Sequence, residues 1–479
     1  MRTHYALFGG RLSKSLVWDV LKNAFSVGAL GLSLLLVYAC ASAPDAQTPA
    51  GTATSTYVYP LRVGPTSRYL VDRNSKPFLL VGDTAWSLFA VLSDPDADFY
   101  LENRKQRGFT AVLANLIEHQ FAANAPADFY EFTPFTGQTF TMPNEVYFAH
   151  VDYVVQSAAA KGIVVLLDPL YLGYDCGSEG WCAEVQAATP SQMMAWGQYV
   201  GNRYKDFDNI VWVIGGDTDP NPVQTKVQAM VDGIFSADSR HLFTAHNAPE
   251  QMAVTPWPGA GWLNVNNVYT YSGIAYQSIL SAYSTSPPMP VFLVEAAYEN
   301  EHGVTNQELR AQSYWSALSG GFGHVFGNCP IWGFGSTSEF CALTNWKAQL
   351  NSLGSVNMQH FQALFRSRHW HLLVPDASHT VMTAGYGTFG RTNYVTTASA
   401  TDGSSILAYL PSSRTVQVTG ASLAGSTMTA WWYNPGTGVA TQIGSYSKSG
   451  IQSFMPPASG DWVLVLDSSS FSLPPPGVS

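Results

Sequence analysis

Short apolar runs alternate with helix-like segments along most of this chain. The runs carry no polar alternation and are only a few residues long, which is typical of parallel strands buried on both faces. They are Phe78–Val81, Ala111–Leu113, Ile163–Leu167, Ile210–Ile214, Leu242–Ala245, Leu263–Val268, Val291–Val294 and His324–Phe326. Eight strands that alternate with helices over roughly 300 residues predict an α/β fold of the (β/α)₈ type, the TIM barrel.

Helix-boundary signals between the runs support this interpretation. Ser93 stands before Asp94 and Asp96, and the segment ends at Arg107 and Gly108, which is the usual order of an N-cap, acidic first turn and glycine C-cap. A second helix is predicted over Gln307–Leu318, before two glycines. A doubly wound sheet would also alternate, but no Gly-x-Gly-x-x-Gly turn follows the first strand.

The pattern changes after residue 373, which ends the predicted barrel domain of residues 57–373. Strand-like runs with Asp-Gly and Asn-Pro-Gly turns follow, without helical segments, and predict a small all-β sandwich over residues 374–467. Residues 468–479 are expected to form a Ser/Pro-rich tail. Trp431, Trp432 and Tyr433 stand in one run, and since neighbours in a strand alternate faces, we expect them chiefly to pack.

The amino terminus is predicted to be an export segment, residues 1–40. Basic residues precede an apolar stretch from Ala24 to Ala39 that is short for a spanning helix. Cys40 follows a small residue, as in a bacterial lipoprotein, although Tyr38 departs from that pattern; ordinary cleavage and an uncleaved anchor remain alternatives. Residues 41–56 are small and polar and predict a flexible linker. The protein is therefore expected at the outer membrane or cell surface, in the periplasm or secreted.

Charge and cysteines narrow the partners. The net charge is −10 and no basic patch follows the export segment, which argues against nucleic-acid binding. The only membrane contact that we expect is a lipid anchor at the amino terminus. Four cysteines remain in an exported chain, and the simplest disulfides are Cys176–Cys182 and Cys329–Cys341. No cofactor or metal site is expected, because the chain has no Cys-x-x-Cys pair or His at ligand spacing. We expect a monomer.

Polar residues follow the predicted strands, at the end where a TIM barrel places its reacting groups. Four of the eight are carboxylates. Strand by strand they are Asp83, Asn115, Asp168, Asp217, His246, Tyr269, Glu295 and Asn328.

Asp217 and Glu295, after the fourth and seventh strands, are the candidate catalytic pair. We expect these strands to face each other across the mouth. Hydrolysis of a glycosidic bond needs one carboxyl group to protonate the departing oxygen and a second to attack or to activate water. Asp217 has an alternative role as a helix cap, and Glu295 one as the partner of an arginine.

The remaining candidates would bind substrate. Either Tyr269 or Tyr271 is expected to donate a hydrogen bond to Glu295. Asp83 is expected either to bind sugar or to cap the next helix, and Asn328 either to bind sugar or to fix its own loop. For Asp168 we expect a structural role. The other predicted substrate-binding residues are Trp86, Asn115, His246, His324 and Trp332.

Several motifs resemble the apiosidase-like glycoside hydrolases. They are residues 68–86 (RYLVDRNSKPFLLVGDTAW), Gly215-Gly216-Asp217, Val294-Glu295, and Gly323 to Asn328 with Pro330-Ile331-Trp332. The resemblance covers about residues 59–375 and implies that Asp217 is the acid/base and Glu295 the nucleophile of a retaining mechanism. Relatives usually carry Asn-Glu where this chain has Gly216-Asp217. The sandwich resembles a collagen-binding domain often found after such barrels.

The expected function is therefore an exported, exo-acting, retaining glycoside hydrolase acting on plant or microbial polysaccharide, with apiose as the sugar that the resemblance suggests. The alternative from another class is a surface carbohydrate- or matrix-binding protein whose barrel has lost activity.

Overall fold

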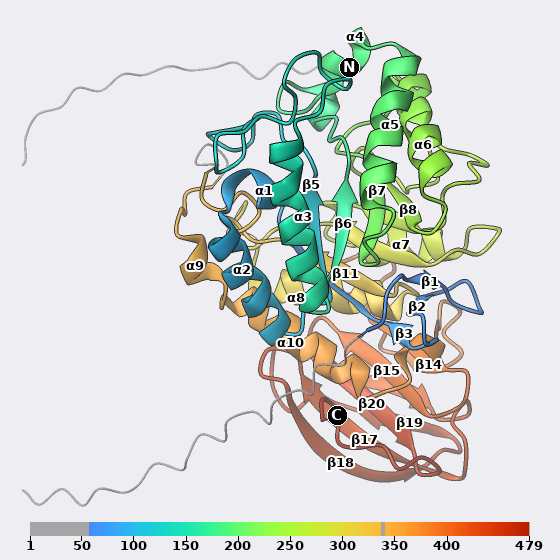
Figure 1. The fold of residues 1–479 in the computed structure, drawn as a ribbon. Helices are drawn as coiled ribbons and strands as arrows, with labels where there is room; N and C mark the ends of the chain where they lie inside the picture. Colours follow the sequence, from blue (N-terminus) through green and yellow to red (C-terminus); the bar gives the residue numbers. More distant parts are fainter. Residues whose placement is uncertain (1–56, 337–340, 479) are drawn as a thin grey trace, which may run out of the picture. The chain divides into compact units, whose positions relative to one another are not determined.

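A computed structural model describes residues 57–336 and 341–478 (Figure 1). The predicted export segment with Cys40 and the predicted linker lie outside these residues. Within them, no helix is both long enough and apolar enough to cross a membrane.

Eight parallel strands form the barrel, in the order β8-β7-β6-β5-β4-β11-β10-β9. The predicted fold class is confirmed. Side-chain and backbone bonds join the first and last strands of this order, including Thr244 Oγ1 to Val265 O (2.8 Å) and Asn267 Nδ2 to Ala245 O (2.7 Å). The strands are β4 (Leu80–Thr84), β5 (Ala111–Asn115), β6 (Val164–Asp168), β7 (Ile210–Gly215), β8 (Leu242–His246), β9 (Asn266–Tyr269), β10 (Val291–Glu295) and β11 (Gly323–Phe326).

The first predicted strand was placed too early in the sequence. Pro77–Phe78 is β3 of a separate antiparallel sheet with β1 (Arg62–Val63) and β2 (Leu70–Val71). Aromatic and aliphatic side chains of this small sheet and the segment before it pack with Leu80 and the barrel interior. Apolar composition alone does not show that one run is divided between two sheets.

Alternation along the strands decides which side chains enter the barrel. Leu113, Leu166 and Val213 belong to an interior cluster, whereas Val112, Leu167 and Trp212 pack outward against helices. Because side chains alternate, the inward positions near the strand ends include Asn115, Asp168 and His246.

The helices surround this sheet and follow the predicted boundaries closely. Ser93 caps α2 by accepting a hydrogen bond from Asp96 N, and Thr305 and Glu308 form a capping box at α8. The helices are α1 (Leu88–Val91), α2 (Asp94–Gln106), α3 (Glu145–Ala160), α4 (Cys182–Ala187), α5 (Pro190–Tyr204), α6 (Gln224–Ala237), α7 (Tyr276–Tyr283), α8 (Asn306–Leu318), α9 (Trp346–Gln349) and α10 (Leu353–Arg366), with short 3₁₀ turns η1 (Tyr174–Cys176) and η2 (Trp370–Leu372).

The carboxyl-terminal region is all β, as predicted. One antiparallel sheet has the order β12-β14-β15-β20-β17-β18 and the other β13-β16-β19. Their strands are β12 (Leu373–Pro375), β13 (Met382–Ala384), β14 (Thr396–Ala400), β15 (Ser405–Leu410), β16 (Val416–Thr419), β17 (Thr427–Asn434), β18 (Val439–Ser447), β19 (Ile451–Phe454) and β20 (Trp462–Ser468).

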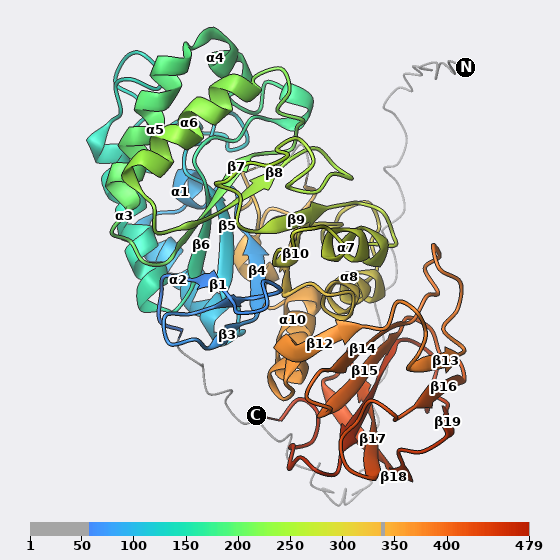
Figure 2. The same ribbon diagram turned by 90° about the vertical axis from the view of Figure 1, so that its right-hand side faces the viewer.

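The larger sheet is covered on both faces. Trp432 packs between the two sheets, while Trp431 and Tyr433, on the opposite face of β17, pack in a cluster with residues of α8 and α10. The ribbon shows α10 next to the strands of the larger sheet (Figure 2). Buried ion pairs join the same regions, Arg310 to Asp461 (2.7 Å) and Arg368 to Asp467 (2.6 Å). The aromatic run therefore packs the core and does not form an exposed platform.

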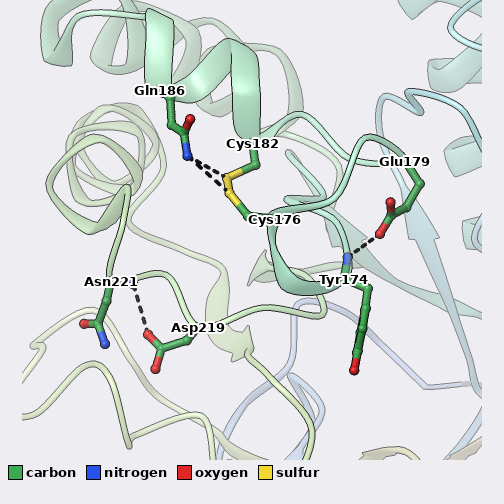
Figure 3. Close-up of a disulfide and its surroundings, with 7 residues drawn as sticks. All are labelled: Tyr174, Cys176, Glu179, Cys182, Gln186, Asp219 and Asn221. Atoms are coloured by element: carbon green, nitrogen blue, oxygen red, sulfur yellow. Dashed lines mark hydrogen bonds between the residues drawn. A yellow bond between two sulfur atoms is a disulfide. The ribbon is translucent and has the colours of Figure 1, made fainter. Parts of the chain in front are cut away.

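Both predicted disulfides are present, Cys176–Cys182 and Cys329–Cys341. The first closes the loop that follows β6 and joins η1 to the start of α4 (Figure 3). The second closes the loop that follows β11.

Candidate active site

Asp217 stands on a turn that only glycines can build. Gly215 and Gly216 have φ values of 111° and 108°, and Asp217 itself has φ 58°, in the left-handed region. A Cβ on Gly216 would collide with the Tyr171 ring. Gly216 N donates to His246 O (2.7 Å), which fixes the turn to the end of β8. Asp217 does not cap a helix: α6 begins after Val223, which makes no side-chain cap.

Glu295 faces the same space because the register of β10 is irregular. Leu293 pairs with Val268 of β9, but Glu295 pairs with the next residue, Tyr269, so that Val294 is an extra residue. Leu293 packs outward, and strict alternation would also turn Glu295 outward. The irregularity pairs Glu295 with Tyr269, which faces inward, so Glu295 faces inward as well. β-Bulges often redirect a side chain in this way beside active sites.

His246 at the end of β8 joins the two carboxylate positions. Asp217 N donates to its Nδ1 (2.9 Å), and its Nε2 lies 2.9 Å from Glu295 Oε2. A backbone N–H is always a donor, so Nδ1 accepts and the ring proton is on Nε2, which donates to Glu295. Burial disfavours the imidazolium, while Glu295, Asp217 and Asp168 shift the pKa of His246 upward. A second proton would displace the Asp217 N–H bond, so the geometry favours the neutral ring.

β7 and β10 stand three steps apart in the closed order of eight strands, one step short of directly opposite each other. This agrees with the expectation that the two strands face each other across the mouth, and the shorter route between them passes β8 and β9. This shorter route explains why His246 on β8 and Tyr269 on β9 reach both sides.

Three tyrosines donate to the pair. Tyr269 Oη donates to Asp217 Oδ1 (2.8 Å) and Tyr171 Oη to Asp217 Oδ2 (3.1 Å). Tyr271 Oη donates to Glu295 Oε1 (3.0 Å), so the tyrosine on Glu295 is Tyr271. Burial, followed by the nearby carboxylates, raises the pKa of all three phenols, which therefore remain hydrogen-bond donors.

Asp217 has the electrostatics of a proton donor. Burial and then the charge of Glu295 raise its pKa to about 6, against the lowering effects of His246 and the two tyrosines. Acids and bases of catalysis work best when their pKa lies near the operating pH. The carboxyl of Asp217 is thus partly protonated under mildly acidic conditions.

Asn115 and Asp168 add polar atoms to the wall of this space. They pair in register on β5 and β6 and both point inward. Neither amide atom of Asn115 nor Asp168 Oδ2 has a hydrogen-bond partner in the described parts of the chain. Burial raises the pKa of Asp168 to about 8, so at neutral pH it is mostly a neutral acid that can donate as well as accept. These atoms suit the hydroxyl groups of a ligand.

Trp86 and Trp332 lie at the edge of the site but are each only 6% exposed. The Trp86 ring packs edge-on to His246 (5.6 Å) and its Nε1 donates to Tyr298 Oη (3.3 Å). Trp332 Nε1 donates to Glu301 Oε1 (2.8 Å). Both rings therefore support neighbouring side chains, and little of either face is open for stacking.

Three residues that were predicted to bind substrate lie elsewhere, and the prediction was wrong for Asp83 and His324. Asp83 is inside β4 and points outward to α2, where it accepts from Tyr100 Oη (2.6 Å) and pairs with Arg104 (3.3 Å). It neither touches the mouth nor caps a helix. His324 points outward to Ser313 of α8 (2.9 Å), and burial lowers its pKa to about 3.

Asn328 is the third of these residues. It is fully buried and donates to Glu299 Oε2 (2.6 Å), so it fixes its own loop, which was the alternative left open by the sequence.

Tyr171 and Tyr298 were missed by sequence reasoning. Both lie in loops a few residues past a strand end, Tyr171 three residues after Asp168 and Tyr298 three residues after Glu295. The signal was an aromatic residue with a hydroxyl close behind a strand-end carboxylate. Many other tyrosines satisfy that description.

Comparison with known proteins places this geometry in a family. A family model described as "Apiosidase-like, catalytic domain" matches residues 65–371, and one described as "Putative collagen-binding domain of a collagenase" matches residues 374–467. A search of curated proteins finds no match.

Two solved structures share the fold. One, titled "Glycoside hydrolase", is 24% identical with a TM-score of 0.77, and covers 87% of this chain and 99% of its own. The other, a glycoside hydrolase family 5 protein from Bacteroides vulgatus, is 23% identical with a TM-score of 0.78, and covers 88% and 98%. Since the first family model spans most of the barrel and well over half of the chain, this protein belongs to the apiosidase-like family of glycosidases.

Proposed function

We propose that this protein is an exported glycoside hydrolase that cleaves a terminal sugar by a retaining mechanism, with Glu295 as nucleophile and Asp217 as acid/base. The observation that carries the proposal is the unequal environment of two carboxylates joined by one histidine. Asp217 has a pKa raised to about 6. Glu295 receives a donor on each oxygen, from His246 and Tyr271.

In the first step, Glu295 attacks the anomeric carbon and forms a covalent ester while the glycosidic C–O bond breaks. Asp217 gives its proton to the departing oxygen. In the second step, Asp217 takes a proton from water, the water oxygen bonds to the anomeric carbon, and Glu295 leaves as the carboxylate. The Tyr271 hydroxyl and His246 Nε2–H hold Glu295 in position for attack.

The proposed substrate is an apiosyl residue of a plant or microbial polysaccharide, as the family description suggests. Asn115 and Asp168 would bind the hydroxyl groups of that sugar. Export, by the amino-terminal segment with Cys40 as a lipid anchor, would bring the enzyme to such a polymer.

The test is activity against a panel of 4-nitrophenyl glycosides that includes the apioside, with product NMR to report the anomeric configuration. We expect release of one sugar with retained configuration, and loss of turnover in Glu295→Ala. Inverted product would contradict the retaining mechanism, and sugar binding without any turnover would favour the binding-protein alternative.

A further inference from the structure

A cavity of ≈ 480 Å³ has in its lining Tyr271, the residue whose hydroxyl donates to Glu295. Its volume falls in the range of roughly 300–1,000 Å³ typical of small-molecule sites. Its walls come from the segments after β9 and β10, one face of α8 and two loops of the β-sandwich. The residues used below are Tyr271, Gly273, Glu308, Trp315, Thr392 and Asn393.

Tyr271 connects this cavity to the chemistry. Its hydroxyl donates to Glu295 Oε1 (3.0 Å), while its side chain, 45% exposed, lines the cavity. Ala297, two residues after Glu295, also lines it. Tyr271 thus contacts Glu295 through its hydroxyl and borders this cavity with the rest of its side chain.

The sandwich completes the opposite wall. Thr392 and Asn393 precede β14, and Pro411 and Ser412 follow β15. Gln307 of α8 donates to Pro411 O, and Trp315 Nε1 donates to Tyr394 O (3.4 Å), so bonds fasten these loops to the barrel around the cavity.

The charges of the lining favour one class of ligand. Among the described residues that line the cavity none is cationic, and the charged one is Glu308. A uronate would face a like charge without a counter-ion, whereas the hydroxyl groups of a neutral sugar can bond to Thr392 and Asn393. Tyr271, which is 45% exposed, supplies the apolar surface that sugar rings also need.

We propose that this cavity is a second sugar subsite, completed by the β-sandwich, which takes a neutral sugar residue adjoining the one cleaved at Glu295. The inference rests on the proposed function and extends it by giving the second domain a part in substrate choice.

Gly273 offers a way to fill the cavity. Its φ lies outside the left-handed region, and an added Cβ would meet only Thr392 Cγ2, at 3.7 Å. Gly273→Tyr should therefore be tolerated by the backbone and occlude the space. The matched control is Gly261→Tyr, in the loop after β8, where a Cβ meets nothing within 4 Å.

The measurement is the ratio of kcat/KM for neutral pectic oligosaccharides to kcat/KM for the single-sugar aryl glycoside. We expect Gly273→Tyr to lower this ratio at least tenfold and Gly261→Tyr to leave it unchanged. Thr392→Tyr fills the cavity from the sandwich side and should act as Gly273→Tyr does, which guards against misfolding of either variant. An unchanged ratio in both filled variants overturns the subsite.

Binding provides a readout without turnover. With full-length Glu295→Gln, calorimetry should show that neutral pectic oligosaccharides bind at least tenfold more tightly than galacturonate-bearing ones of the same length. Equal or tighter binding of the galacturonate set overturns the choice of a neutral sugar. Aryl glycoside activity that survives in Glu295→Ala contradicts the proposed function instead, so the two failures are distinguishable.

Discussion

Asp217 and Glu295 lie at the same end of the barrel but are held in opposite ways. Asp217 stands on a left-handed Gly-Gly turn outside the strand, and burial raises its pKa to about 6. Glu295 still pairs with Tyr269 of β9 and accepts hydrogen bonds from a histidine and a tyrosine. One environment favours a carboxyl that keeps its proton, and the other holds a carboxyl between two hydrogen-bond donors. Two similar side chains thus gain different chemistry from the backbone that presents them.

The largest expected effects come from removing each carboxylate in turn. Glu295→Ala should lower kcat by at least about 10³-fold on every substrate, because no covalent step remains. Asp217→Ala should lower kcat/KM, which reports the first step, by a similar factor for poor leaving groups but much less for 4-nitrophenol, which departs without a proton. Steady-state kinetics over a series of aryl glycosides measures this contrast. Equal dependence on the leaving group in both variants would remove the distinction between the two roles.

The tyrosines should separate the same roles more gently. Tyr271→Phe removes a donor from Glu295 and should lower kcat by about tenfold, with little change in the pH profile. Tyr269→Phe removes a hydrogen bond that lowers the pKa of Asp217. That pKa should then rise, and since the protonated acid is the active form, the alkaline limb of kcat/KM should move to higher pH.

The control for the tyrosine pair is Tyr174→Phe, on the exposed disulfide loop after β6 (Figure 3), where the hydroxyl bonds to neither carboxylate. A shift of the alkaline limb to lower pH in Tyr269→Phe, or an equal shift in Tyr271→Phe, would refute the assignment of donors.

Sequence patterns predicted the barrel because eight apolar runs and their helix caps are local signals. They also predicted the end of the barrel that holds polar side chains. They did not predict which way a strand-end residue points. Asp83 and His324 end in outward positions because Leu80 and Val325 occupy the inward ones. Glu295 faces inward only through the extra residue Val294, and a register irregularity depends on the pairing partner and not on the strand itself.

The role of Asp217 could not be predicted from the sequence either, because it depends on distant contacts. The sequence placed Asp217 after the fourth strand, but the pKa of Asp217 depends on the hydroxyl groups of Tyr171 and Tyr269, which lie 46 and 52 residues away in sequence. Such tertiary contacts leave no spacing that a single sequence can display.

A side chain at Gly216 should lower both the stability of the protein and the order of the active site. Gly216→Ala places a Cβ against the Tyr171 ring at φ 108°, so it should lower the free energy of unfolding by about 1–3 kcal/mol and also displace the Tyr171 hydroxyl from Asp217. Thermal unfolding and the pH profile together test this. Gly259→Ala, also at positive φ but with nothing near its Cβ, separates backbone strain from the collision.

The smallest expected effect is on the free energy of unfolding, because burial makes the ionised form of Asp217 unfavourable. Its folded pKa of about 6 lies above the usual aspartate pKa of 3.8, so its contribution to stability is fully present below pH about 4 and is lost as the pH rises through about 6. Asp217→Asn stays neutral and should therefore be more stable than the parent by about 1–2 kcal/mol at pH 8, with little gain at pH 4. Denaturant unfolding at the two pH values measures the difference. Glu295→Gln removes a carboxylate that His246 and Tyr271 both contact, and should not stabilise the chain at pH 8. Equal stabilisation by both amides would mean that the two carboxylates share one environment, and would contradict their unequal roles. Stabilisation by Asp217→Asn alone would show that burying the ionised proton donor lowers the stability of the folded chain.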